Sequence, residues 1–248
     1  IRAYDGKSWG PWSSHTLVSG IPNRAPIVAS IPAQVVAVDG IKSIYKLIKT
    51  SDKDKDRITE YRVKDTTGDS SFTLNGESID ASGEDGYQFD ASELSTLRVL
   101  ADSSASTQTL KIAAYDGEDW SAWRSFRLTS NSLPLVEITT PSLLHLRTNY
   151  KEGTGDFDIT YSDDDGDDAV KYQIQSYAKS ANVAHNFKTS TKGKYTKLTS
   201  YKGKLLTINA RDISQVWIQG GTRPFRETIK IRAYDGKSWG PWSSHTLV

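Results

Sequence analysis

The sequence predicts an all-β protein built from two tandem β-sandwich modules. One segment, "IRAYDGKSWGPWSSHTLV", occurs at both 1–18 and 231–248, and a looser copy occupies 112–128. Apolar residues alternate with polar ones just before the Asp-Gly of each copy, which is the period of a half-buried strand. The remaining apolar runs are short and mostly separated by turn residues, and about seven short strands in about 110 residues are typical of a sandwich.

The repeat sets the domain organisation. Ile1 and Ile112 are 111 positions apart, and Ile112 and Ile231 are 119 apart. Other landmarks recur at similar offsets, so we expect two modules on one plan, the second with insertions. The predicted bounds are 1–18 for the terminal hairpin of a preceding repeat, 19–130 for the first module and 131–248 for the second. A duplicated tag is the alternative, but the looser middle copy favours natural repetition.

Six short apolar runs precede the hairpin of the first module and are expected to be strands. They occupy 26–31, 34–39, 43–50, 58–65, 71–79 and 96–101. One helical turn is expected near Asp90, because Asp90 and Glu93 have the spacing of a capping box. Residues 19–25 and 129–133 read as short linkers, which favours a semi-rigid rod over freely tumbling modules.

The hairpin closes each module. In the first module Leu110, Ile112 and Ala114 share one face of a strand, and Asp116-Gly117 follows as a turn. A second strand is expected from Trp123 onwards. The same pattern recurs at the end of the second module.

Composition excludes several classes of function. The 248-residue chain has a net charge of +1, so its overall charge favours no nucleic acid. It has no cysteine, which removes disulfides, thiolate metal sites and cysteine nucleophiles. No apolar run reaches the roughly 18 residues of a membrane span. The absence of methionine leads us to expect a segment of a longer chain.

Two acidic loops are candidate calcium sites. They contain alternating carboxylates, which can converge on a hard cation that prefers oxygen ligands. Neither is an EF-hand, since Val63 and Ile174 occupy the position where a glutamate is needed. A solvated acidic turn is the alternative reading. The candidate ligands are Asp52, Asp54 and Asp56 in the first module and Asp163, Asp165 and Asp167 in the second.

The second loop is the stronger of the two candidates on sequence. Asp164 and Asp168 add negative charge there, and Gly166 permits the turn. In the first loop Lys53 and Lys55 partly cancel the field of the carboxylates.

The paired tryptophans have a structural and a binding interpretation. Trp239 and Trp242, like their counterparts in the other copies, are three positions apart, so a regular strand would point them to opposite faces. Arg2 and Arg232 are placed to stack between the rings, as in the Trp-Ser-x-Trp-Ser hairpin of cytokine-receptor fibronectin domains. The middle copy has Ala113 at that position. We favour this ladder over an exposed-ring sugar platform.

A lysine-rich stretch distinguishes the second module. Between 171 and 210 there are eight lysines, interleaved with tyrosines, and no acidic residue. Such a patch could bind an anionic polysaccharide or extracellular DNA. The simpler interpretation is a solvated hairpin face, in which lysines also protect an edge strand. The candidate ligand-binding lysines are Lys192, Lys194, Lys202 and Lys204.

The order of motifs resembles a known family. Asn-x-x-Pro, Ser-Asp-x-Asp-x-Asp and Ala-Tyr-Asp-Gly-x-x-Trp-x-x-Trp follow one another in the second module, and the first departs only slightly. This order is similar to the tandem cadherin-like or immunoglobulin-like repeats of giant bacterial surface adhesins, of the RTX-associated or surface-layer type. Lys55 departs from the usual glycine of the loop, and the lysine-rich insertion is not part of the family pattern.

The resemblance implies an extracellular location on the bacterial cell surface and a role in adhesion. We therefore expect a non-enzymatic, calcium-stiffened stalk or adhesive array whose partners are neighbouring repeats. A carbohydrate- or polyanion-binding module is the alternative. The four histidines form no metalloprotease motif, and nucleophile-elbow and phosphate-loop motifs are absent. Because 1–18 is identical to 231–248, head-to-tail self-association by strand exchange is a further expectation.

Overall fold

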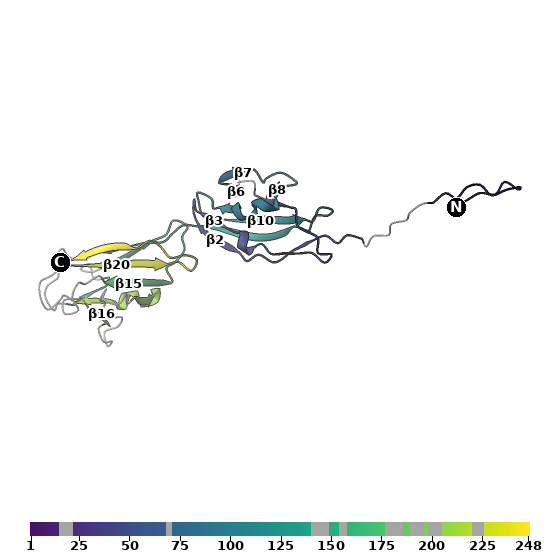
Figure 1. Ribbon diagram of the computed structural model, residues 1–248. Coiled ribbons are helices and arrows are strands. Elements are labelled where there is room, and N and C mark those ends of the chain that lie inside the picture. The colour runs from purple at the N-terminus through teal and green to yellow at the C-terminus, as the bar shows by residue number, and fades with distance from the viewer. Residues whose placement is uncertain are drawn as a thin grey trace.

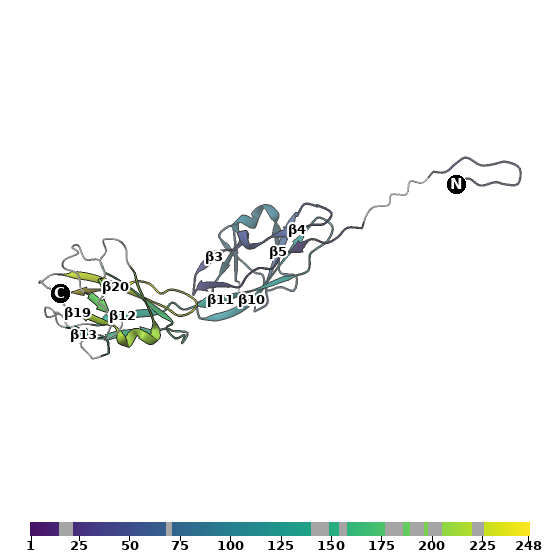
Figure 2. The ribbon, with the colours of Figure 1, turned by 90° about the horizontal axis from the view of Figure 1, so that it is seen from below.

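The computed structural model consists of β-sheets arranged in two successive bodies. It describes residues 1–14, 22–67, 71–139, 149–153, 158–176, 186–188, 196–197, 205–219 and 226–248. The two bodies lie end to end in both views, and the N-terminal segment extends away from them (Figure 1, Figure 2). Among the described residues, no helix is long and apolar enough to cross a membrane. The all-β sandwich prediction is confirmed.

The first module is a sandwich of two sheets. The five-stranded sheet has the order β2-β11-β10-β5-β8, and the four-stranded sheet has the order β3-β9-β6-β7. A short pair, β1 (Ile27–Val28) and β4 (Thr50–Ser51), lies beside them. The strands of the first sheet are β2 (Gln34–Ala37), β5 (Glu60–Asp65), β8 (Tyr87–Asp90), β10 (Ser106–Tyr115) and β11 (Arg124–Asn131). Those of the second are β3 (Ile41–Ser43), β6 (Phe72–Leu74), β7 (Glu77–Ile79) and β9 (Arg98–Leu100).

Two of the expected strands have a different local structure. The run 43–50 contains the 3-10 helix η1 (Tyr45–Leu47), in which the N–H groups of Leu47 and Ile48 donate to the carbonyls three residues earlier, at 2.9 and 3.2 Å. The run 71–79 is the hairpin β6–β7, which reverses at Asn75 and Gly76 with φ of +54° and +90°.

The predicted helical turn is confirmed. It is the 3-10 helix η2 (Ala91–Thr96), and the Asp90 N–H donates to Glu93 Oε2 at 3.2 Å. Its counterpart in the second module is η4 (Ala210–Gln215).

The second module is assembled on the same plan. Its hairpin sheet has the order β18-β15-β20-β21, and further sheets are β13-β19-β16-β17 and the pair β12-β14. The strands of the hairpin sheet are β15 (Lys171–Ser176), β18 (Leu206–Asn209), β20 (Glu227–Tyr234) and β21 (Ser243–Leu247). The others are β12 (Leu135–Thr139), β13 (Asn149–Lys151), β14 (Asp158–Ser162), β16 (Asn186–Lys188), β17 (Thr196–Lys197) and β19 (Trp217–Gln219).

The described hydrophobic residues form two separate cores. One core cluster runs from Val28 to Leu128 and includes Phe72 and Ile112, both fully buried. The other runs from Val136 to Ala233. Because each cluster draws on one segment of the chain, the hydrophobic stabilisation of each module is largely its own.

Residues 129–133 are not a linker throughout, as the sequence suggested. Strand β11 continues to Asn131, because its last four residues pair in parallel with β2, from Leu128↔Gln34 to Asn131↔Ala37. Ser130 and Asn131 are buried as a result. Only residues 132–134 separate β11 from β12, so the connection between the modules is short.

Candidate cation site at the module junctions

The first acidic loop brings its carboxylates together. It follows β4, and the backbone N–H groups of Asp54 and Asp56 donate to Asp52 Oδ1 at 2.7 and 3.2 Å. Asp52, Asp54 and Asp56 each present one oxygen, and these oxygens lie within 4.8 Å of one another. Asp52 Oδ2 is buried and accepts no hydrogen bond. The loop therefore brings together three carboxylate oxygens of the kind that a hard cation binds.

The chain entering the first module is hydrogen-bonded to two acidic turns. The Arg24 N–H donates to Asp54 Oδ2 at 2.9 Å, and Asn23 Nδ2 donates to Asp116 Oδ2 at 3.1 Å and Asp119 Oδ2 at 3.0 Å. Asp116 belongs to the Tyr-Asp-Gly turn after β10. The junction segment is thus hydrogen-bonded both to the aspartate loop and to the hairpin turn.

Asp116 is held ionised by its own turn. Burial opposes ionisation of this carboxyl, but the N–H groups of Asp119 and Glu118 donate to its Oδ1, each at 2.8 Å, and the pKa of Asp116 is lowered overall. The carboxylate is therefore available to Asn23 as a charged acceptor at neutral pH.

The second module repeats the contacts of the entering chain. The Ser132 N–H donates to Asp165 Oδ2 at 3.3 Å, and Asn131 Nδ2 donates to Asp235 Oδ2 at 2.8 Å. The Asp165 N–H donates to Asp163 Oδ1 at 3.1 Å, which matches Asp54 and Asp52 in the first module. The entering chain therefore makes equivalent hydrogen bonds in both modules.

The two junctions differ in several charges, and one of these differences places a lysine against the acidic loop. In the second module the Lys237 ammonium lies 2.6 Å from Asp167 Oδ2 and 3.8 Å from Asp165 Oδ2. Its ion pair with Asp167 outweighs the cost of burial and raises the pKa of Lys237. The corresponding residue of the first module, two positions after the Asp of the turn, is Glu118.

Crowding of carboxylates in the second loop perturbs their protonation. Burial and a hydrogen bond with Asp165 raise the pKa of Asp163 to about 6, while the same hydrogen bond lowers the pKa of Asp165. The Tyr161 hydroxyl lies 3.3 Å from Asp163 Oδ2 and donates to the Asp167 carbonyl at 2.7 Å. The two neighbouring carboxyl groups thus have pKa values shifted in opposite directions.

The surroundings of the two loops differ in the lysines that approach them. The lysines that the sequence set against the first loop, Lys53 and Lys55, are exposed, whereas the lysine that neutralises an acidic loop is Lys237 in the second. Lys55 has a φ of +69° where the second module has Gly166 at +79°. A lysine in this left-handed region costs roughly 1–2 kcal/mol. In the sequence, the difference between Glu118 and Lys237 inside the hairpin motif was the signal that could have indicated a lysine beside the second acidic loop.

The tryptophans form the predicted ladder in all three copies. Arg2 lies 4.7 Å from the ring centroids of both Trp9 and Trp12. Arg232 lies 4.7 Å from Trp239 and 4.5 Å from Trp242. The backbone between the paired tryptophans is irregular, so the rings face one another across the guanidinium.

The middle copy also has an arginine, which the sequence reading missed. Arg62 lies 4.4 Å from the Trp120 centroid and 4.5 Å from the Trp123 centroid. It comes from β5, directly opposite Ala113 of β10. In the second module the corresponding pair is Gln173 and Arg232, so the arginine has changed strands.

The structure describes only two of the residues predicted to bind a ligand, Trp239 and Trp242. Trp239 and Trp242 are half-buried, and each has a face covered by Arg232, which leaves less ring surface for a sugar. Lys192, Lys194, Lys202 and Lys204 lie outside the described residues.

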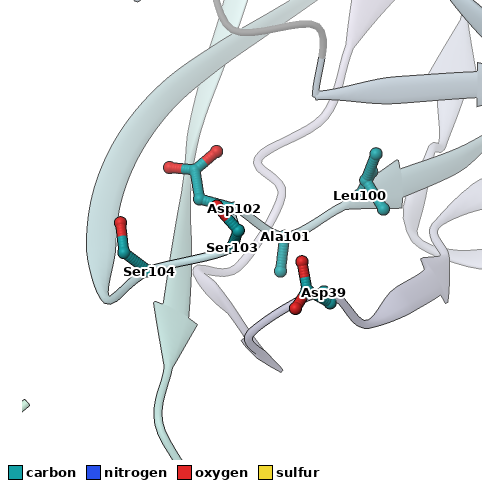
Figure 3. Close-up of a pocket in the computed structure, with 6 residues that line it drawn as sticks. All are labelled: Asp39, Leu100, Ala101, Asp102, Ser103 and Ser104. Atoms are coloured by element: carbon teal, nitrogen blue, oxygen red, sulfur yellow. The ribbon is translucent and has the colours of Figure 1, made fainter. Parts of the chain in front are cut away.

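A surface hollow of about 480 Å³ lies on the first module (Figure 3). It is lined by Asp39, Leu100, Ala101, Asp102, Ser103 and Ser104. Both carboxylate oxygens of Asp102 are already engaged, one by the Ser106 hydroxyl and the other by Gln108 Nε2.

Comparisons with known proteins give only low similarity. No family model matches it, and no curated protein sequence matches it. Among solved structures, the chicken CNTN1 FN1–FN3 domains show 12% identity over 91% of this chain and 67% of that one, with a TM-score of 0.37. A 282-residue C-terminal intimin fragment in complex with the Tir intimin-binding domain shows 10% identity over 92% and 64%, with a TM-score of 0.39.

The match to a third solved structure covers a smaller share of that structure's chain. The protocadherin gamma B2 extracellular cadherin domains 1–5 show 15% identity over 90% of this chain and 38% of that one, with a TM-score of 0.29. The chain thus spans less than two thirds of this protein and of the intimin fragment. These similarities are too low to assign a function.

Proposed function

We propose that the chain is a non-enzymatic structural segment of a bacterial surface adhesin, stiffened by calcium at the junction that precedes the first module. The observation that carries the proposal is the hydrogen bonding of the entering chain, at Asn23 and Arg24, to both acidic turns. Any ion that orders these turns therefore also orders the connection to whatever precedes the module.

Charge repulsion supplies the reason for an ion. Asp52, Asp54 and Asp56 converge. Asp116, Glu118 and Asp119 lie in the turn that is joined to this loop through Asn23 and Arg24. A divalent cation would relieve this repulsion and provide a partner for the buried Asp52 Oδ2. Calcium sites of extracellular modules typically bind with Kd values of about 0.1–1 mM. That range suits an exported protein.

Calcium titration of the whole chain tests the proposal. We expect calorimetry to detect binding and the melting temperature of the first module to rise in CaCl2 relative to EGTA, because an ion that binds only the folded state adds RT ln(1 + [L]/Kd). Asp54→Asn should weaken binding. Asp80→Asn is the matched control, since Asp80 is exposed and accepts hydrogen bonds from Ser82 in a similar local turn. Absence of binding heat and of any melting shift would refute calcium stiffening.

A second candidate role is self-association through the N-terminal segment. Ile1 is 93% exposed, whereas the identical position Ile231 is fully buried in β20. Exchange of this segment for 231–248 of a second copy would bury Ile1 and join chains head to tail. Size-exclusion chromatography of a chain that begins at Ser19 tests this: an unchanged assembly state would count against exchange.

Glycan binding keeps support from the same segment. Trp9 and Trp12 are 57% and 72% exposed, more than their counterparts in the modules. Tryptophan fluorescence titrated with oligosaccharides, compared between the full chain and the chain starting at Ser19, would detect such a platform. An identical, flat response in both would remove it.

A further inference from the structure

The two junctions present the same scaffold with opposite charges at one position. Glu118 and Lys237 each lie two residues after the aspartate of the hairpin turn, and each donates its backbone N–H to that aspartate, at 2.8 and 2.6 Å. The backbone is therefore equivalent at the two positions. At this position the difference between the junctions therefore lies in the side chain. The turns also differ at Asp119 and Ser238, and the acidic loops differ at Lys53 and Asp164, Lys55 and Gly166, and Arg57 and Asp168.

The Lys237 ammonium lies among the carboxylates of its loop. It contacts Asp167 at 2.6 Å and Asp165 at 3.8 Å, and Asp235 contributes further attraction. The side chain of Asp165 is only 6% exposed, and its Oδ1 is buried and accepts no hydrogen bond. A buried carboxylate without a full set of partners is costly, so the positive charge of Lys237, whose side chain is 39% exposed, offsets part of that cost.

The first junction has no comparable cation in its described part. Arg24 approaches Asp54 only at 3.9 Å, and its side chain is 57% exposed. An exposed ion pair of this kind contributes little to stability. Glu118 instead adds negative charge to the turn.

We propose that Lys237 is a built-in counter-ion that replaces a divalent cation at the second junction, so that residue 118 or 237 decides whether a module depends on metal. The inference rests on the proposed calcium site of the first junction. It predicts that low calcium would loosen the first junction while the second stays ordered.

Reciprocal substitutions in the full chain test the proposal. The wild-type chain should bind one calcium ion by calorimetry. Lys237→Glu should raise this number to two and make the second module's melting temperature respond to calcium. Glu118→Lys should reduce it to zero. Lys237→Arg keeps the charge and should leave one site, and Lys171→Glu is a control of equal charge change at an exposed lysine of the same module.

The outcomes separate this inference from the calcium proposal. Two ions bound by the wild-type chain, or a Lys237→Glu chain that folds and gains no calcium response, would overturn the counter-ion role. If Lys237→Glu fails to fold, Lys237→Met supplies the same test, and its second module should be destabilised in EGTA and rescued by calcium. A wild-type chain that binds no calcium while Lys237→Glu binds one would sink the first junction's site and support the lysine's role.

Discussion

The arginine of the tryptophan ladder should be transferable between strands. In the first module Arg62 and Ala113 face each other across β5 and β10, and in the second Gln173 and Arg232 occupy the same two places. The double substitution Arg62→Gln with Ala113→Arg would give the first module the arrangement of the second. We expect each single change to destabilise the module and the pair to restore it.

The magnitude follows from the contacts. Arg62 lies within 4.5 Å of both ring centroids, and a cation–π contact contributes roughly 0.5–2 kcal/mol. Arg62→Gln should therefore cost about 1–3 kcal/mol, or roughly 4–12 °C in melting temperature for a module of this size. Arg62 Nε is buried without a hydrogen bond, whereas Arg232 donates from Nε and Nη2 to Gln173 at 2.9 and 2.7 Å. The double variant gains these bonds and should match the wild type within about 1 kcal/mol.

Calorimetric melting of the four chains gives the coupling energy directly. The wild type, the two single variants and the double variant form a double-mutant cycle. A coupling of more than about 1 kcal/mol is expected, because Ala113→Arg alone forces two arginines into one ladder. A double variant whose loss equals the sum of the single losses would refute the idea that the strands exchange this side chain.

Three further outcomes follow from the structure. Asn131→Ala removes a buried donor to Asp235 and should lower the unfolding free energy of the second module by about 1–3 kcal/mol. This loss should exceed the loss that Asn23→Ala causes in the first module, and equal losses by calorimetry would contradict the role of burial. Because the pKa of Asp163 is raised to about 6 in the folded state, the second module should lose stability as pH rises from about 4 through 6. Asp163→Asn should reduce this pH dependence of the melting temperature, measured in EGTA. Phe72→Ala should lower the unfolding free energy of the first module alone, by about 3–5 kcal/mol, whereas the exposed control Ile41→Ala should change it little. An equal loss in the second module would contradict separate cores.

Local sequence patterns predicted much of the fold. The alternation around Ile112, the Asp116-Gly117 turn and the capping pair Asp90 and Glu93 act between near neighbours, so their structural meaning can be read without the rest of the chain. The 3-10 helix at Tyr45–Leu47 escaped prediction, because a short apolar run does not distinguish a strand from a tight turn.

The sequence alone determined the repeat, the hairpins and the alternation of carboxylates in each loop, since each depends on spacing within a few residues. Only the tertiary structure decided that Arg62 stands where Ala113 leaves space, and that Lys237 reaches a loop some 70 positions earlier. Both contacts depend on how distant strands align. The charge at a junction is consequently set by side chains that meet only after the sheets have formed.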